Sequence, residues 1–134
     1  MATRTDVSFR RWQVGKVRVT KIVESESLID LPAMFPKASL ADVQKLDWLK
    51  PHFVTEDWMG KLSIHALVVE TGDLTIVVDT CIGNDRDRLA YESNSNLQTA
   101  FLQDFEAAGF DPAKVDVVLC THLHFDHVGW NTML

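Results

Sequence analysis

The sequence predicts an α+β fold in which a mixed β-sheet carries helices on one face. Two observations lead to this class. Segments with the alternation or apolar content of β-strands occur with helical patterns in the order strands, helix, strands, helix, strand. The last strand runs directly into residues 120–130, a segment rich in histidine. The 134 residues are enough for one ordinary domain, and 46% hydrophobic content is ample for its core.

A β-hairpin is predicted near the N-terminus. Residues 9–14 and 17–24 alternate apolar and polar side chains and are joined around Gly15 and Lys16. Residues 25–37 contain two prolines and little periodicity, so we expect a loop there.

A helix is predicted over residues 40–49. Ser39 is a suitable N-cap, Asp42 stands at the third helical position, and Pro51 ends the pattern. Residues 52–61 show no regular pattern, which indicates irregular structure.

Two further strands are predicted over residues 62–71 and 74–79, linked by a turn at Gly72 and Asp73. Residues 81–96 are polar and include a run of alternating charges, which is typical of a solvated loop.

A second helix and a final strand follow. Residues 97–108 place apolar side chains along one helical face, and Gly109 closes the helix. Residues 115–120 are almost wholly apolar, which predicts a strand buried on both faces.

Composition excludes several classes of function. The net charge of −6 is unsuited to a nucleic-acid surface, and no stretch reaches the roughly 20 apolar residues of a membrane span. The first residues lack the apolar core of a signal peptide, so a cytoplasmic protein is expected. Cys81 and Cys120 are therefore expected to be reduced packing residues without a disulfide, and Cys120 is not expected to bind metal.

Four metal-capable side chains fall within six positions, in the pattern His122-x-His124-x-Asp126-His127. In an extended segment His122 and His124 point the same way, because they are two residues apart. Asp126 and His127 are adjacent and must diverge, so they suit a second ion beside the first. Imidazole and carboxylate together favour zinc or a similar first-row ion. The segment therefore predicts a metal site rather than a polar turn with surface histidines.

The segment Thr121–Trp130, with the strand before it, resembles the metal-binding signature of the metallo-beta-lactamase fold hydrolases. Residues 74–80 resemble the family's hydrophobic strand that ends in an aspartate, here Asp79. The long N-terminal lead and residues 63–71 are similar to the lactonase and organophosphate-hydrolase branch. The resemblance implies an αββα-type metallo-beta-lactamase fold. Residues 1–134 would then be the N-terminal part of a single domain whose C-terminal half is absent.

The resemblance also implies roles for individual residues. In the complete family two metal ions hold a bridging hydroxide that attacks esters, lactones or related substrates. His122 and His124 would bind the first ion, and Asp126 and His127 the second. Asp126 would also be catalytic, because it would orient the nucleophile, whereas Asp79 would support the loop from behind the ligands. The implied cofactor is a pair of Zn²⁺ ions, with manganese, iron or cobalt as alternatives.

The complete family adds a third histidine, a bridging aspartate and a last histidine from sequence downstream of this segment. Here seven residues follow His127, and none is His, Asp, Glu or Cys. Three interpretations stay open: an incomplete hydrolase fragment with little activity, a non-catalytic metal-binding half-domain, and a redox member of the fold of the diiron or sulfur dioxygenase type. The expected partners are a small-molecule substrate and either the missing half or a second copy, with no nucleic acid and no membrane.

Other candidate residues carry weaker signals. His65 lies in a predicted strand and is expected to be structural, and His52 is expected at the surface. Trp130 is expected to anchor packing. Three apolar side chains stay open between pocket lining and ordinary packing: Phe53, Trp58 and Met59.

Overall fold

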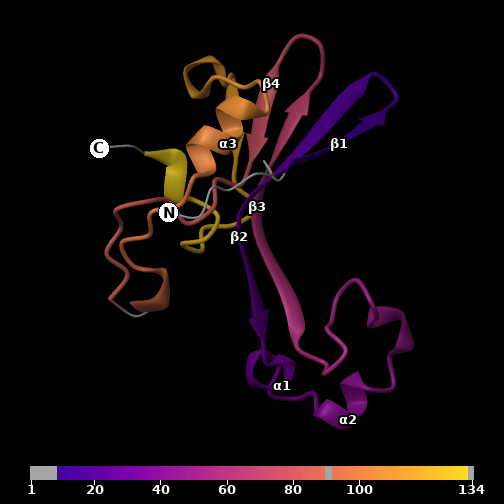
Figure 1. The fold of residues 1–134 in the computed structure, drawn as a ribbon. Helices are drawn as coiled ribbons and strands as arrows, with labels where there is room; N and C mark the ends of the chain where they lie inside the picture. Colours follow the sequence, from indigo (N-terminus) through magenta and orange to yellow (C-terminus); the bar gives the residue numbers. More distant parts are fainter. Residues whose placement is uncertain (1–8, 90–91, 133–134) are drawn as a thin grey trace. The chain divides into compact units, whose positions relative to one another are not determined.

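The computed structural model describes residues 9–89 and 92–132. The five strands found there form one mixed sheet in the order β1-β2-β3-β4-β5 (Figure 1). The strands are β1 (Phe9–Val14), β2 (Val17–Ile29), β3 (Gly60–Glu70), β4 (Thr75–Val78) and β5 (Val117–Leu119). The helices are α1 (Leu31–Met34), α2 (Leu40–Val43) and α3 (Phe101–Ala107). Short 3₁₀ turns occur at η1 (Asp47–Leu49), η2 (Glu92–Asn94), η3 (Pro112–Lys114) and η4 (Gly129–Asn131).

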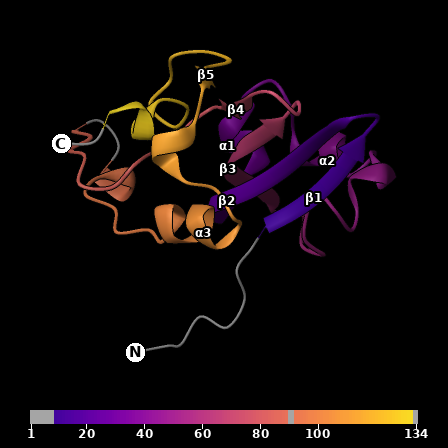
Figure 2. The ribbon, with the colours of Figure 1, turned by 90° about the horizontal axis from the view of Figure 1, so that it is seen from above.

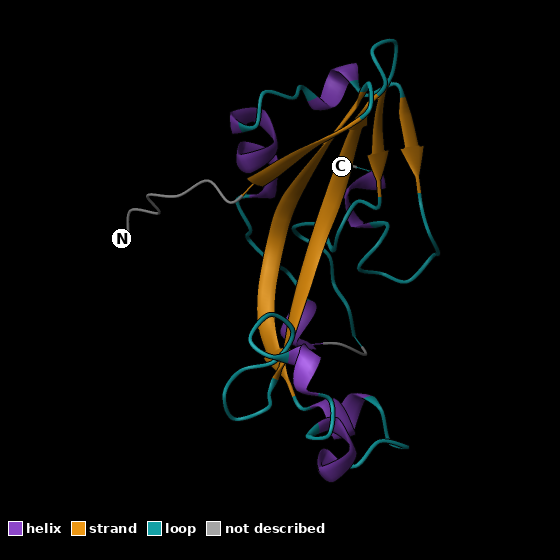
Figure 3. Ribbon diagram, turned by 90° about the vertical axis from the view of Figure 1, so that its right-hand side faces the viewer, coloured by secondary structure: helices purple, strands orange, loops and turns teal. Residues whose placement is uncertain are grey.

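The chain divides into two compact units. One contains the described residues up to Ser25 together with those from Ile64 onward, and the other is Glu26–Ser63. The first unit holds the hairpin β1–β2, the strands β4 and β5, and α3. The second holds α1, α2 and η1 with the end of β2 and the start of β3. Figure 3 shows β2 and β3 as the two longest strands, of 13 and 11 residues.

The predicted N-terminal hairpin is confirmed. β1 and β2 pair antiparallel, with Phe9 opposite Ile22 and Val14 opposite Val17. Gly15 has a φ of 59° in the turn between them, a left-handed conformation that costs glycine little because it has no Cβ.

The loop predicted over residues 25–37 is wrong over much of its length. β2 continues to Ile29, because the sheet provides β3 as its neighbour, and α1 follows directly. Pro32 counted against a helix in the sequence. It stands in the first turn of α1, where a missing N–H removes no helical hydrogen bond.

The helix predicted over residues 40–49 begins as expected and ends early. Asp42 N–H donates to Ser39 Oγ over 3.2 Å, and Ser39 N–H donates to Asp42 Oδ2 over 3.3 Å, which completes a capping box. The α-helix stops at Val43, the only buried residue of α2. With so little apolar surface to pack, propensity alone does not sustain a longer helix. None of the described helices is long and apolar enough to cross a membrane.

The central strands follow the prediction. β3 and β4 pair antiparallel, with Leu67 opposite Val78 and Glu70 opposite Thr75, and the turn between them contains Gly72. β4 and β5 are parallel, with Val77 beside Val118. The sheet is therefore mixed, as predicted.

One helix covers the sheet of the first unit. α3 lies against one sheet face (Figure 2) and packs its apolar side in a single cluster with three strands. The members of this cluster are Ile22, Ala66, Val68, Val77, Cys81, Phe101, Phe105 and Ala108. α3 ends before Gly109, whose φ of 93° suits a helix C-terminus.

The helix predicted from residue 97 begins only at Phe101. The residues before it form an irregular connection, in which Thr99 N–H donates to Asn84 Oδ1 over 2.8 Å and Asn84 Nδ2 donates back to Thr99 O over 3.0 Å. This side-chain contact supplies hydrogen bonds that compete with the first helical turn.

The prediction that the last strand is buried on both faces is wrong. Val118 is 46% exposed and Leu119 is 52% exposed. β5 pairs with β4 and forms the edge of the sheet in the described part of the chain. A continuous apolar run indicates burial only where another layer covers the strand.

Candidate metal centre

The candidate site lies where the parallel strands β4 and β5 end. Because parallel neighbours end at the same sheet edge, Asp79 after β4 and the loop after β5 begin side by side. Asp79 N–H donates to Leu119 O over 2.8 Å. Its φ of 57° is left-handed, a conformation that aspartate tolerates better than most residues and that recurs at functional sites.

The Asp79 carboxylate holds the beginning of the loop. Oδ1 accepts from Thr121 N–H and Oδ2 from the Thr121 hydroxyl, both over 2.8 Å. Burial raises the pKa of the Asp79 carboxyl, but the hydrogen bonds with His127 and Thr121 outweigh it, so the pKa lies below its ordinary value. Asp79 is therefore an ionised acceptor in the neutral range.

This carboxylate also fixes the protonation of His127. His127 Nδ1 lies 2.8 Å from Asp79 Oδ2, and an ionised carboxylate can only accept, so Nδ1 must donate. In the neutral ring Nε2 then carries the lone pair. That nitrogen lies 3.5 Å from Asp126 Oδ2.

Thr121 also influences which ring nitrogen of His122 is protonated. The hydroxyl has one proton, which it donates to Asp79. Its oxygen lies 3.1 Å from His122 Nδ1 and can accept a hydrogen bond from an N–H at that nitrogen. Nε2 of His122 is then the nitrogen with a free lone pair.

His122 and His124 place two ring nitrogens side by side. His122 Nε2 lies 3.0 Å from His124 Nδ1, and the ring planes are 72° apart. Two nitrogens on one tetrahedral zinc ion, at ordinary Zn–N distances, lie roughly 3.3 Å apart. Both side chains are exposed, so an ion can reach them.

The side chains of the loop supply donor atoms that a borderline first-row ion accepts. They are imidazole nitrogens and one carboxylate, the ligands that zinc accepts. The structure places His122 Nε2 beside His124 Nδ1 and His127 Nε2 beside Asp126 Oδ2, and it also brings the His122 and His127 rings to 4.0 Å between centroids. Within residues 9–89 and 92–132, no three His, Cys, Asp or Glu side chains gather around a common point. Each pair thus lacks the further ligands that closed zinc sites use.

The far end of the loop is fixed to the segment that follows β4. Thr80 N–H donates to His127 O over 2.9 Å, and Gly129 N–H donates to Cys81 O over 2.8 Å. The backbones meet so closely that a Cβ on Gly129 would lie 1.9 Å from Ile82 C and O. Glycine is required here because no side chain fits.

Glu24 is a site-supporting residue that sequence reasoning missed. It is 7% exposed, although it carries a carboxyl group. Its oxygens accept from Ile82 N–H over 2.7 Å, from Gly83 N–H over 3.2 Å and from Trp130 Nε1 over 2.8 Å. The available signal was a glutamate directly after Ile22 and Val23 in a predicted strand, since a charged side chain in an apolar run needs a partner.

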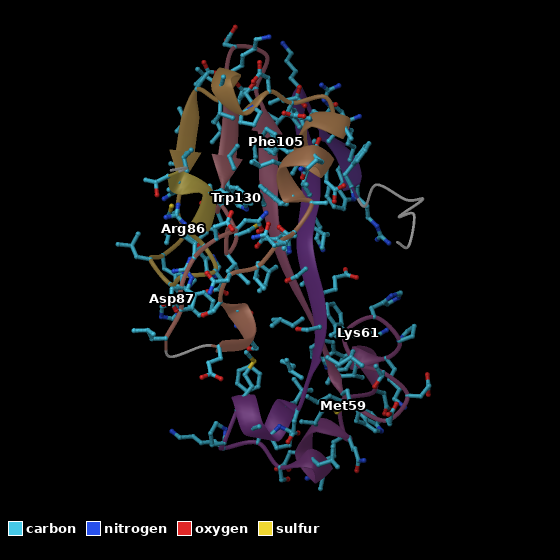
Figure 4. All side chains as sticks on the ribbon, turned by 60° about the vertical axis from the view of Figure 1, so that its left-hand side comes forward. Met59, Lys61, Arg86, Asp87, Phe105 and Trp130 are labelled. Atoms are coloured by element: carbon cyan, nitrogen blue, oxygen red, sulfur yellow. The ribbon has the colours of Figure 1, made fainter. Side chains whose placement is uncertain are left out.

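The remaining candidates are placed as packing or surface groups. Trp130 (labelled in Figure 4) stacks on Phe101, with ring centroids 5.9 Å apart, which agrees with the predicted packing anchor. His65 lies within β3 and is half-buried. Cys81 and Cys120 are free thiols, as predicted, and burial raises the pKa of the Cys81 thiol. Cys120 Sγ lies 3.3 Å from Asn131 Nδ2.

In the Glu26–Ser63 unit, the apolar candidates pack locally. Lys50 Nζ lies 4.4 Å from the centre of the Trp58 ring, and Trp48 meets Phe53 edge to face. Phe53 is 57% exposed and Met59 is half-buried. His52 is exposed, as predicted.

The family follows from this fold and site. The sequence model of the metallo-beta-lactamase superfamily matches residues 59–134, more than half of the chain. The chain belongs to the metallo-beta-lactamase superfamily, which confirms the resemblance found in the sequence.

Solved structures agree on the fold. AidC, a dizinc quorum-quenching lactonase solved with a product, is 22% identical, with a TM-score of 0.67 over 90% of this chain and 38% of that one. The hydrolase AbOPH of the beta lactamase superfamily is 23% identical, with a TM-score of 0.62 over 93% and 39%. A probable metal-dependent hydrolase from Staphylococcus aureus is 23% identical, with a TM-score of 0.64 over 88% and 42%. This chain thus spans about two fifths of the length of these proteins. Among curated proteins none matches it.

Proposed function

We propose that this chain forms part of the dinuclear zinc centre of a metal-dependent hydrolase that acts on esters, lactones or related substrates. The observation that carries the proposal is the pairing of donors in the loop after β5. His122 Nε2 and His124 Nδ1 lie 3.0 Å apart, and His127 Nε2 lies 3.5 Å from Asp126 Oδ2. Two such pairs match the donors of two neighbouring ions.

In this proposal His122 and His124 hold the first ion, and Asp126 and His127 hold the second. Zinc suits the donors best, and manganese, iron and cobalt are the alternatives. Zinc bound there would lower the pKa of a water ligand to about 7 and polarise a carbonyl or phosphoryl oxygen.

The chain's own residues orient the donors and hold protons. Asp79 accepts a hydrogen bond from Nδ1–H of His127, which keeps Nε2 available as a ligand atom. Asp126 is the catalytic residue in this scheme. Its side chain is 30% exposed, so its carboxylate can accept a hydrogen bond from the attacking water and orient it toward the substrate.

The substrate class rests on the superfamily and on one solved relative. Hydrolysis is the reaction named for several of the structures that share this fold, and one of them is a dizinc lactonase. A lactone or ester carbonyl suits a centre that polarises oxygen and positions water. The same fold supports many chemistries, so the choice among these substrates depends on residues beyond the donor pairs.

Full activity requires ligands beyond the two pairs, because zinc sites use three or four protein ligands. We propose that a second segment of protein or a second copy of the chain supplies them. Two features of the first unit support such a partner. The β5 edge is exposed, and beside it lies an open apolar cavity of about 240 Å³. Its lining includes Val77, Phe101, Phe105, Val115, Val118 and Trp130.

Cobalt substitution tests the assignment of donors. Metal-free chain loaded with Co²⁺ should develop visible absorption from nitrogen ligation, and His122→Ala should weaken it strongly. His52→Ala is the matched control, since His52 is exposed in the Glu26–Ser63 unit and is not among the proposed ligands. An identical cobalt spectrum in His122→Ala and in the unaltered chain would contradict the assignment. Preferential iron binding without zinc-dependent hydrolysis would favour a redox member of the fold instead.

A further inference from the structure

The metal loop, residues 121–128, is held at its two ends by two different carboxylates. At its start Thr121 donates twice to Asp79. Just after its end Trp130 donates from Nε1 to Glu24 Oε1 over 2.8 Å. All four proposed metal ligands lie between these anchors. Neither carboxylate is near the ligands in the sequence, since Asp79 follows β4 and Glu24 lies in β2.

Glu24 joins two backbone segments with one buried side chain. Oε2 accepts from Ile82 N–H over 2.7 Å, and Oε1 accepts from Gly83 N–H over 3.2 Å. Oε1 also lies 3.3 Å from the Thr99 hydroxyl and 2.8 Å from Trp130 Nε1. Four donors thus converge on a carboxylate that is 7% exposed, and hydrogen bonds to a charged acceptor are the strong ones.

The segment that Glu24 holds is the one against which His127 rests. Residues 80–83 contact the end of the metal loop through the bonds from Thr80 N–H to His127 O and from Gly129 N–H to Cys81 O. Gly129 and Ile82 approach so closely that neither backbone can move toward the other without displacing it. A shift of Ile82 or Trp130 would therefore be transmitted to the backbone of His127.

We propose that Glu24 is a positioning residue of the metal centre: it fixes residues 80–83 and Trp130 together, and so sets the place of His127 and Asp126. The effect of Glu24 on zinc binding rests on the proposed function. The effect of Glu24 on the position of the loop rests only on the contacts described above. Asp79 orients the His127 ring, whereas Glu24 locates the backbone that carries it.

The chemistry of Glu24→Gln makes a sharp test. An amide has one accepting oxygen and one donating nitrogen. If the nitrogen replaces Oε2 it faces the Ile82 N–H, and if it replaces Oε1 it faces Gly83, Thr99 and Trp130. In either orientation a donor meets a donor. Trp130→Phe is the gentler variant, because it removes the one bond to Glu24 and retains the aromatic ring that stacks on Phe101.

Two readouts on the full chain separate the loop effect from the metal effect. The first is amide hydrogen exchange of the metal-free protein at His127, Gly129 and Trp130, whose N–H groups bond to His124 O, Cys81 O and Thr80 O. Both variants should speed this exchange about tenfold, as loss of a hydrogen bond to a charged group implies. Exchange in the β3–β4 pair should change much less. The second readout is Zn²⁺ affinity by calorimetry, which should fall about tenfold, as for other outer partners of metal ligands.

Val68→Ala is the control for a general loss of stability, since Val68 is fully buried in the core cluster and forms none of the side-chain hydrogen bonds that hold the loop. It should speed exchange throughout the sheet without singling out residues 127–130. Loop exchange and zinc affinity unchanged in Trp130→Phe and Glu24→Gln would overturn the inference. If Glu24→Gln does not fold, Trp130→Phe decides. If the unaltered chain binds no zinc, the proposed function fails, while the exchange result still supports or overturns the positioning role.

Discussion

The close approach of two backbones behind the metal loop makes Gly129→Ala the most revealing single substitution. An added Cβ would lie 1.9 Å from Ile82 C and O and 2.5 Å from Gly83 N. All three are backbone atoms, so no side chain can rotate away to make room. Residues 80–83 or the end of the metal loop must move instead.

The expected loss of stability can be bounded from ordinary packing costs. Forcing one extra carbon into a well-packed site costs about 1–3 kcal/mol, and strain on backbone atoms lies at or above the upper end of that range. We therefore expect Gly129→Ala to lower the free energy of unfolding by about 3 kcal/mol or more. Because the loop must shift, zinc affinity should fall as well.

Gly15→Ala is the matched control. Gly15 has a positive φ, and a Cβ there would meet nothing within 4 Å. Gly15→Ala should therefore lower the free energy of unfolding only by the cost of a left-handed conformation for a residue with a Cβ, about 1–2 kcal/mol. Urea denaturation followed by circular dichroism measures both variants, with unchanged m-values as the condition for comparison. Equal losses of unfolding free energy in Gly129→Ala and Gly15→Ala would show that the close contact between Gly129 and Ile82 does not hold the loop.

Three further predictions follow from the site and the sheet edge. Asp79→Asn should weaken zinc binding by about tenfold, because an amide, unlike a carboxylate, can also donate and so no longer requires the proton of His127 to be on Nδ1. Calorimetry should show this loss in Asp79→Asn and little change in the control variant His65→Gln. The chain should self-associate through the exposed β5 edge and its apolar cavity, and a strictly monomeric mass by light scattering across a wide concentration range would contradict this. In a form completed by further His and Asp ligands, Asp126→Asn should lower kcat far more than it raises KM for a chromogenic lactone, whereas His65→Gln should change little; the reverse order would show that the roles are misassigned.

The parts of the fold that the sequence predicts are those set by local patterns. The hairpin around Gly15, the capping box at Ser39 and the strand pair β3–β4 depend on neighbouring residues and are found as expected. The length of β2 and the exposure of β5 depend on which strand or layer lies alongside. The sequence of residues 25–29 does not indicate that β3 lies alongside and extends β2. The apolar residues of β5 likewise do not indicate that β5 lies at the sheet edge.

The candidate site likewise contains residues that local patterns predict and residues whose partners are distant in the sequence. The spacing of His122, His124, Asp126 and His127 predicts the donors, because ligand chemistry is carried by residue type and separation. Glu24 and Gly129 could not be assigned in this way, since their partners lie 58 and 47 positions away, at Ile82 in both cases, and become neighbours only in the folded chain. Asp79 was predicted to support the loop, and its carboxylate accepts from the Thr121 hydroxyl and lies 2.8 Å from His127 Nδ1.

Zinc calorimetry on the metal-free chain of residues 1–134 tests the central claim most directly. The claim is that two incomplete donor pairs sit side by side in the loop after β5. It predicts weak binding, far from the affinity of closed four-ligand sites, with up to two ions per chain and loss of one ion's binding in His122→Ala. Binding that is absent in the unaltered chain, or that is unchanged in His122→Ala and Asp126→Asn alike, would contradict it.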